Sequence, residues 1–379
     1  MPLAPTALRS RVARRISAVA TGVRVLWWRV RYRFASQRRT VIIAEPGRCH
    51  AEVILGLLDD LERAHLSVAV ILNDGLRDSA AVSLAERGIP TVFIRNEFFP
   101  SALRSVASNR MTAVLMNSSW DYSRQVSIPS DWGRTLARRT NVCWILHDAA
   151  ELESDHSLVE LQRARRVAVL VANHPSDAPV VFPLGAFERG TRHRDGCSFL
   201  VPASTFQDYS LLLDGVEKAC ERLGSAGAFR VDITGRLKPK RFASVVDEIE
   251  RRGLTESVRI LGFLDDVRFA REVESADFLI GPVGTHPYEE GRHAVSGTRQ
   301  LTLASLTPAL VPEELLDTWG LSKDEVVSIE AGAVDSALVR AVQMSHDAYS
   351  ALQDSLEVRR AAHSEANLRA FERLFGGWM

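Results

Sequence analysis

The chain has 379 residues, of which 46% are hydrophobic and 25% charged, a composition typical of a soluble globular protein with two or three domains. Its four cysteines, Cys49, Cys143, Cys197 and Cys220, lie far apart without a C-x-x-C pair, which argues against a disulfide framework and a structural zinc site. The net charge is zero, but the first forty residues hold ten arginines and no acid, so the remaining chain, with 37 basic and 47 acidic residues, carries ten net negative charges.

Residues 1–39 form a basic amphipathic segment. Within residues 7–34, apolar side chains recur every three or four positions in an arc of about 100°, with arginines opposite, which predicts a helix. No apolar run approaches the ~20 residues that span a bilayer. Either the helix lies in the plane of an anionic membrane surface, with Trp27 and Trp28 near the headgroups, or it docks on its own domain with a solvated basic face. A transit peptide has a similar composition, whereas the acidic body argues against nucleic-acid binding.

From residue 40 onward, short β-branched runs alternate with helical stretches. Such alternation predicts βαβ units and a parallel sheet, which binds ligands at the carboxyl ends of its strands. In a first domain, residues 40–183, we expect strands at Thr40–Glu45, Ser67–Leu72, Pro90–Ile94, Thr112–Met116, Asn141–Leu146 and Arg166–Ala172, and helices at Glu52–Ala64 and Ser79–Arg87.

Glycine, proline and charged residues gather in residues 184–196, which is the composition of a linker. The alternation restarts in a second domain, residues 197–345, and two such domains leave a cleft where ligands bind. The expected strands are Ser198–Val201, Arg230–Thr234, Ser257–Leu261, Asp277–Gly281 and Thr307–Pro312; the expected helices are Tyr209–Arg222, Lys240–Arg252, Val267–Ser275 and Thr298–Ser305. One helical run from Asp335 to Phe375 closes the chain.

The most informative motifs lie in the second domain. The segment VRILGFLDD at 258–266 leads to ESADFLIGP at 274–282, and a loop then leads to EEGRHAVSGTRQLTLASLTPALV at 289–311. This order resembles the nucleotide-sugar domain of GT-B glycosyltransferases, and the resemblance extends more thinly over residues 40–379. It implies an α/β fold of two Rossmann-like, doubly wound domains facing a cleft, with a C-terminal helix, residues 346–379, that crosses back onto the first domain.

The start of the helix after this loop is the predicted diphosphate site. Free amide groups and the helix dipole at Ser296, Gly297 and Thr298 can hold a diphosphate. Ser296 is alternatively an ordinary helix N-cap.

The resemblance also assigns glutamates to the donor sugar. Glu290 resembles the first of the two glutamates that retaining members of the family carry, with Glu289 as the alternative. The second glutamate falls near Leu301, which cannot bind a ribose.

Phosphate-neutralising cations are expected in a different loop from the family's usual one. The family places an arginine and a lysine after the first strand of this domain, but residues 201–208 contain no cation. Arg236, between Gly235 and Lys238, is the expected substitute because its guanidinium can grip a phosphate with two hydrogen bonds, and Lys238 is a second candidate. Arg236 is alternatively a solvated turn residue.

The acceptor side of the cleft is expected in the first domain. His147 and Asp148 resemble a His-Asp pair of the family, and His147 can exchange a proton or donate a hydrogen bond; alternatively, His147 bonds to backbone and Asp148 caps a helix. Gly47 matches a glycine loop that lines the cleft. Asp121 is a candidate base for an inverting reaction, and His174 ends the sixth expected strand.

The resemblance implies sugar transfer from a nucleotide-diphosphate donor to a glycan or lipid-linked acceptor, without cofactor or metal. With residues 7–34 on an anionic membrane surface, the enzyme would be a peripheral protein of polysaccharide biosynthesis at the cytoplasmic membrane face. The missing second glutamate and cation pair leave two alternatives open: a catalytically silent scaffold or sugar-binding subunit, and a nucleotide-sugar epimerase of the same fold.

Overall fold

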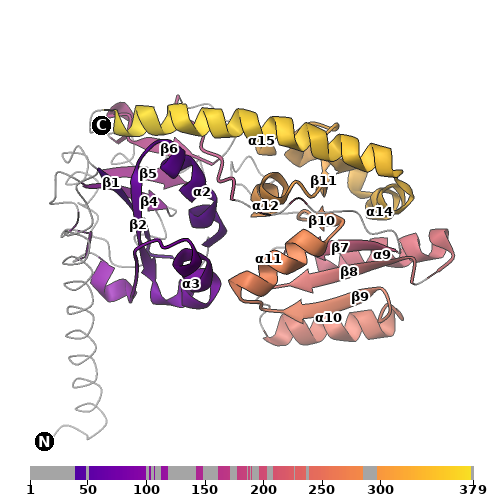
Figure 1. Ribbon diagram of the computed structural model, residues 1–379. Helices are drawn as coiled ribbons and strands as arrows, with labels where there is room; N and C mark the ends of the chain where they lie inside the picture. Colours follow the sequence, from indigo (N-terminus) through magenta and orange to yellow (C-terminus); the bar gives the residue numbers. More distant parts are fainter. Residues whose placement is uncertain are drawn as a thin grey trace, which may run out of the picture.

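A computed structural model describes residues 39–47, 51–99, 102–103, 106, 112–117, 142–147, 161–170, 177–185, 187, 189, 196–202, 208–225, 227–235, 239–284 and 297–376. These residues form two parallel six-stranded sheets, each with helices packed against it (Figure 1). The helix expected within residues 7–34 lies outside the described residues.

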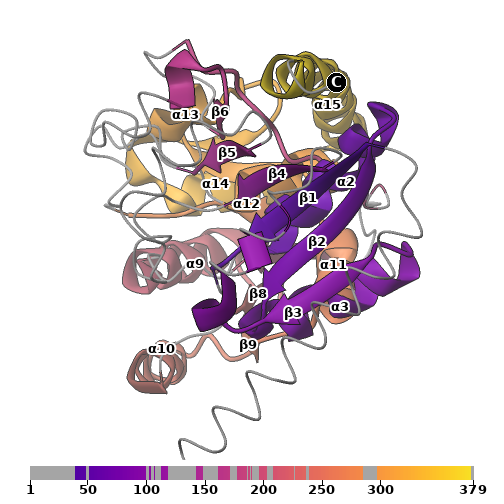
Figure 2. The same ribbon diagram turned by 90° about the vertical axis from the view of Figure 1, so that its left-hand side faces the viewer.

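The N-terminal sheet has the strand order β3-β2-β1-β4-β5-β6 (Figure 2). The order reverses between β1 and β4, which makes this junction the topological switch point of the sheet. All six expected strands are confirmed, although the last is shorter than expected: they are β1 (Thr40–Glu45), β2 (Ser67–Asn73), β3 (Thr91–Ile94), β4 (Thr112–Asn117), β5 (Val142–Leu146) and β6 (Val167–Val169). Helices α2 (Ala51–Arg63) and α3 (Arg77–Glu86) connect the first three strands, with short 3-10 turns at Asp74–Leu76 and Asn96–Phe98.

The C-terminal sheet repeats the same winding in the order β12-β11-β10-β7-β8-β9. Its strands are β7 (Cys197–Val201), β8 (Phe229–Thr234), β9 (Val258–Gly262), β10 (Phe278–Ile280), β11 (Ala309–Pro312) and β12 (Val327–Ile329). Its helices are α9 (Tyr209–Leu223), α10 (Pro239–Arg251), α11 (Asp266–Ser275), α12 (Gly297–Ser305), α13 (Leu316–Trp319) and α14 (Val334–Gln343), and 3-10 turns cover Glu313–Leu315 and Glu330–Gly332. The three-residue strand β12 was not expected from the sequence.

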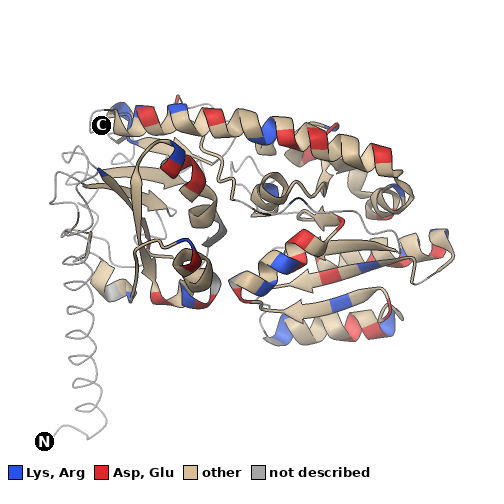
Figure 3. Ribbon diagram, viewed as in Figure 1, with Lys and Arg blue, Asp and Glu red and all other residues tan. Residues whose placement is uncertain are grey.

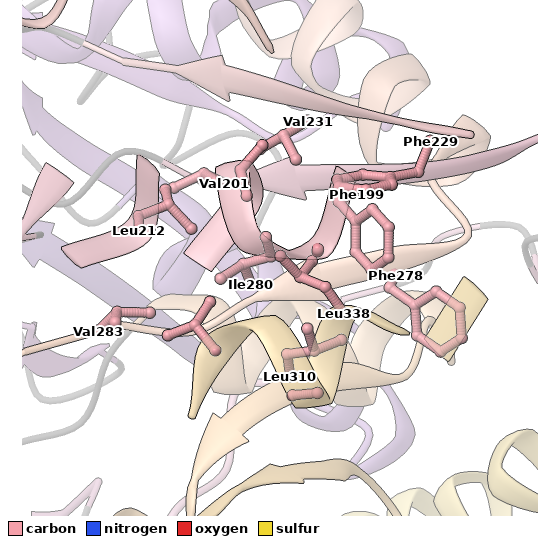
Figure 4. Close-up of a cluster of buried hydrophobic side chains, with 14 of the residues drawn as sticks. Phe199, Val201, Leu212, Phe229, Val231, Phe278, Ile280, Val283, Leu310 and Leu338 are labelled. Carbon is pink, nitrogen blue, oxygen red and sulfur yellow. The ribbon is translucent and has the colours of Figure 1, made fainter. Parts of the chain in front are cut away.

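Aromatic rings fill the core of the C-terminal domain (Figure 4). Phe199 stacks on Phe278 at 5.5 Å between ring centroids and meets the edge of Phe229 at 5.6 Å. Because all three rings are buried, this cluster removes a large apolar area from water and holds β7, β8 and β10 together.

The single helical run expected from Asp335 to Phe375 is wrong at one point. α14 ends at Gln343, and α15 (His346–Phe375) begins after Met344 adopts an extended conformation. The hydroxyl of Ser345 accepts a hydrogen bond from the Ala348 amide at 3.2 Å and thereby caps α15. A serine side chain that competes for helix amides explains why an uninterrupted helical pattern contains a break.

α15 spans both domains (Figures 1 and 2). It packs against α12 of the C-terminal domain and against α2 of the N-terminal domain. Its last turns bury Phe371 and Phe375 in the N-terminal core. The helix also carries both acidic and basic residues (Figure 3). None of the described helices combines the length and the apolarity that crossing a bilayer requires.

Candidate functional site

The N-terminal turn of α12 lies where the two domains meet. The helix begins at Gly297, as the sequence predicts, and packs against α2 of the other domain. Nη1 of Arg299 donates a hydrogen bond to the carbonyl of Leu170, directly after β6, at 2.7 Å. The contact joins the first turn of α12 to the carboxyl end of a strand of the N-terminal sheet, which is the edge where doubly wound sheets bind ligands.

Arg299 is an unusual residue for such a junction. It is 1% exposed, and its guanidinium lies 4.3 Å from the centroid of the Phe182 ring. Among the described residues, its Nε and Nη2 have no hydrogen-bond partner. Burial, with a smaller contribution from Arg359, lowers the pKa of Arg299 to about 9, so the group still carries its charge at neutral pH. Arg299 was not predicted from the sequence, although it is the one charged residue of the otherwise uncharged segment Gly297–Ser305, and that was the available signal.

Glycines shape the carboxyl edge of the C-terminal sheet. Gly235, after β8, has a positive φ of 113° and donates its amide to the Gly262 carbonyl at 2.8 Å. Gly284, after β10, has a φ of 92°, and a Cβ atom there would lie 2.5 Å from the Cβ of Asp208. Asp208 in turn caps α9 by accepting from the amides of Ser210 and Leu211. The end of β8 is therefore held against the end of β9, and the segment after β10 is held against the start of α9.

Most of the predicted donor residues lie outside the described part of the chain: these are Arg236, Lys238, Glu289, Glu290 and Ser296. Thr298 is described and buried in the first turn of α12. Leu301, at the position of the family's second glutamate, is 3% exposed and belongs to an apolar cluster with Trp319.

In the N-terminal domain, His147 belongs to a hydrogen-bonded chain of three side chains. Its Nε2 lies 3.2 Å from Oδ1 of Asn117, and Nδ2 of Asn117 donates to Oε2 of Glu45 at 3.0 Å. The other oxygen of Glu45 accepts from the amide of Gly47. Glu45 and Asn117 are fully buried, whereas His147 is half-buried. The structure thus brings two predicted residues, Gly47 and His147, together through two that were not predicted.

A second buried amide holds the same loop from the other side. Asn73, at the end of β2, donates from Nδ2 to the Pro46 carbonyl at 2.8 Å, contacts Oδ1 of Asn96, and accepts from the Gly75 amide. Polar residues at the ends of strongly apolar strands were the sequence signal for these positions.

The other residues predicted for the acceptor side of the cleft lie outside the described residues: Asp121, Asp148 and His174. Within the described ranges, no group of three or more His, Cys, Asp or Glu residues could hold a metal ion.

Comparisons with known proteins relate the chain to other structures by fold. No protein-family model matches the sequence, and no curated protein matches it. Among solved structures, HepE of Anabaena, in complex with UDP and glucose, has a TM-score of 0.57 and 14% identity over 89% of this chain and 99% of its own. A glycosyltransferase from Rickettsia africae has a TM-score of 0.56 and 11% identity, with 90% and 99% covered.

Sucrose-phosphate synthase of Thermosynechococcus elongatus is similar to the same extent, with a TM-score of 0.54 and 14% identity over 89% of this chain and 99% of its own. Each of these proteins is matched over nearly its whole length, so the likeness covers both domains. The chain therefore has the GT-B fold, two Rossmann-like domains that face each other, as the sequence predicts.

Proposed function

We propose that this chain is a glycosyltransferase that moves a sugar from a nucleotide-diphosphate donor to a hydroxyl acceptor. The observation that carries the proposal is the position of α12. Its N-terminal turn lies between the two domains, beside the carboxyl end of β6. HepE, which has a similar fold, has been solved with UDP bound. A helix N-terminus at this place favours a diphosphate through its amides and its dipole.

The donor would bind mainly to the C-terminal domain. The amides of Gly297 and Thr298 would hold the diphosphate, with Arg236 and Lys238 as the cations and Glu290 toward the sugar. As the bond to the anomeric carbon breaks, negative charge gathers on the leaving diphosphate. Preorganised donors that meet this charge lower the barrier of the transfer.

The acceptor would enter from the N-terminal domain. His147 and Gly47 lie at the carboxyl edge of its sheet, and Asp148, Asp121 and His174 are the further candidates there. A hydroxyl group is the functional group that a glycan or a lipid-linked acceptor offers. Closure of the two domains would exclude water and limit hydrolysis of the donor.

Calorimetry with UDP, GDP and ADP on the full chain tests donor binding directly. Gly297→Pro removes an amide donor at the first helical residue, where proline is tolerated. We expect UDP to bind roughly tenfold or more weakly, because a hydrogen bond to a charged group contributes about 1.5–3 kcal/mol. His346→Pro makes the same change at the exposed first residue of α15 and serves as the matched control.

Product analysis then separates the functions that the fold allows. Transfer to an added acceptor supports the proposal, and conversion of the donor sugar without any acceptor indicates an epimerase. A wild-type chain that binds none of the three nucleotides is a scaffold or sugar-binding subunit, and the proposal is then wrong.

We further propose that residues 7–34 hold the enzyme on an anionic membrane at the cytoplasmic face, where a lipid-linked acceptor would be within reach. The support is the arginine-rich amphipathic pattern of this segment. Flotation with anionic and with neutral liposomes tests it. The full chain should float with anionic vesicles alone, and a variant lacking residues 1–38 should not; equal flotation of both proteins contradicts the proposal.

A further inference from the structure

A cation without a counter-ion is buried at the junction of the two domains. Arg299 is the third residue of α12, and only 1% of it is exposed. Its Nη1 donates to the Leu170 carbonyl, whereas its Nε and Nη2 have no hydrogen-bond partner among the described residues. A charge that water does not reach is costly unless an opposite charge or a full set of hydrogen bonds compensates it.

The surroundings of Arg299 supply no negative charge. Its guanidinium lies against the Phe182 ring, and the titratable groups that interact with it electrostatically, Arg359 and His363, both lie on α15. Arg359 is itself a cation and is paired with Glu325. The pKa of His363 is lowered to about 3, so its imidazole is neutral near pH 7. Within the described ranges, no carboxylate influences the pKa of Arg299.

The position of Arg299 in its helix also opposes its charge. The amides of a first turn have no partner within the helix and give its N-terminus a partial positive charge. Arg299 lies in that turn of α12. Side chains of an α-helix lean toward its N-terminus, which directs the guanidinium toward the amide end at Gly297. Two positive features therefore meet at one place, and a single anion bound there would compensate both.

We propose that Arg299 is a binding determinant for the donor diphosphate that acts through space: its buried charge attracts an anion that rests on the amide end of α12. The inference rests on the proposed glycosyl transfer for the identity of the anion. Direct contact is not required, because the attraction between two charges grows as water is excluded from the space between them. The anion would meet the backbone amides, and the guanidinium would hold it from behind them.

Two substitutions separate the charge of Arg299 from its shape. Arg299→Met removes the charge but keeps a long, unbranched side chain, and Arg299→Lys keeps a charge without the guanidinium. Calorimetry on the full chain measures the binding of UDP and of inorganic pyrophosphate. A pH of 6.5 is used because burial lowers the pKa of a lysine. We expect both ligands to bind roughly tenfold or more weakly to Arg299→Met, and within about threefold of wild type to Arg299→Lys.

Arg360→Met is the matched control. Nη1 of Arg360, on α15, donates to the Ala304 carbonyl at 3.1 Å, near the carboxyl end of α12. The variant therefore removes the same charge and the same kind of hydrogen bond at the opposite end of the same helix. In about 0.1 M salt, which screens charges that are partly exposed and distant, both ligands should bind within about twofold of wild type. Urea unfolding shows that each variant is folded.

Each outcome decides between the inference and its alternatives. Equal binding of pyrophosphate by wild type and Arg299→Met overturns the role of Arg299, and UDP binding by both then leaves the proposed glycosyl transfer intact. A lysine variant as weak as the methionine variant overturns the action through space. An equal loss in Arg360→Met indicates a general effect of net charge and overturns it too. A wild type that binds pyrophosphate through Arg299 but binds no nucleotide upholds the anion site and refutes glycosyl transfer; binding of neither ligand overturns both.

Discussion

The amide of Asn367 fastens the end of α15 to the N-terminal domain, and its replacement by leucine is the perturbation with the clearest expected cost. Asn367 is fully buried. Its Oδ1 accepts from the Phe182 amide at 2.7 Å, and its Nδ2 donates to the Phe182 carbonyl and to Oδ2 of Asp60, each at 2.5 Å. Asn367→Leu conserves volume but leaves three buried polar groups without this partner.

The magnitude follows from these three groups. Each unsatisfied buried group costs about 1–3 kcal/mol, and Asp60 keeps its contacts with Ser364 and Arg63. Desolvation already raises the pKa of Asp60, and the hydrogen bond from Asn367 opposes that rise. We therefore expect the free energy of unfolding to fall by roughly 3–5 kcal/mol.

Urea unfolding followed by tryptophan fluorescence measures this loss, and hydrogen–deuterium exchange shows whether the last turns of α15 detach first. Arg369→Ala, an exposed change two residues away, is the control and should stay within about 0.5 kcal/mol of wild type. A loss below about 1 kcal/mol in Asn367→Leu, with unchanged protection of α15, would refute the reasoning.

Three further changes probe other parts of the chain. Burial, and then neighbouring guanidinium groups, lower the pKa of His363 to about 3. As the pH falls, the imidazole of His363 is therefore protonated in the unfolded chain before it is protonated in the folded one. The free energy of unfolding then falls by about 1.4 kcal/mol per pH unit from about pH 6.5 toward 3, and His363→Leu should remove this contribution from acid-unfolding curves. Gly56→Ala would bring a Cβ within 2.7 Å of Pro183, so we expect a loss of about 1–3 kcal/mol in urea unfolding instead of the usual gain in helix propensity. Gly284→Ala would strain a positive φ and press on Asp208, and calorimetry should show roughly tenfold weaker UDP binding.

The helices and strands were predictable because the apolar residues of each element recur at the spacing typical of that element. Thr40–Ala44 is a continuous β-branched and apolar run, and the strand that it forms with Glu45 is buried throughout. The break at Met344 was not predictable in the same way, because the helical pattern continues across it and the capping of Ser345 needs only one local hydrogen bond. β12 was missed because three residues give no readable period.

The site was predictable only where a residue stands next to a recognisable motif. His147 and Gly47 follow expected strands, and Gly297 follows the Glu-Gly loop. Asn117 and Glu45, which connect to His147 through hydrogen bonds, lie 30 and 102 residues before it in the sequence. The order of the strands in the sheet brings them together, and the sequence pattern does not reveal that order. Arg299 is similar: its contacts with Leu170 and Phe182 exist because α12 meets the N-terminal domain there.

The environment of α12 decides which part of a nucleotide it can recognise. All residues from Thr298 to Ser305 are buried, and Leu301 is packed among apolar side chains, so only the amide end at Gly297 is available to a ligand. A helix that can bind a ligand through its N-terminal backbone amides, and through none of its side chains, favours the diphosphate over the ribose.

We therefore expect UDP and its 2′-deoxy analogue to bind with affinities within about threefold of each other, because no carboxylate from α12 bonds to the ribose; such a bond would be worth about 1.5–3 kcal/mol, or roughly tenfold or more. Competition calorimetry with the two nucleotides measures the ratio, and inorganic pyrophosphate should displace both. A preference of tenfold or more for UDP would show that a ribose contact has been rebuilt elsewhere in the cleft, and that the end of α12 is not the main determinant of donor binding.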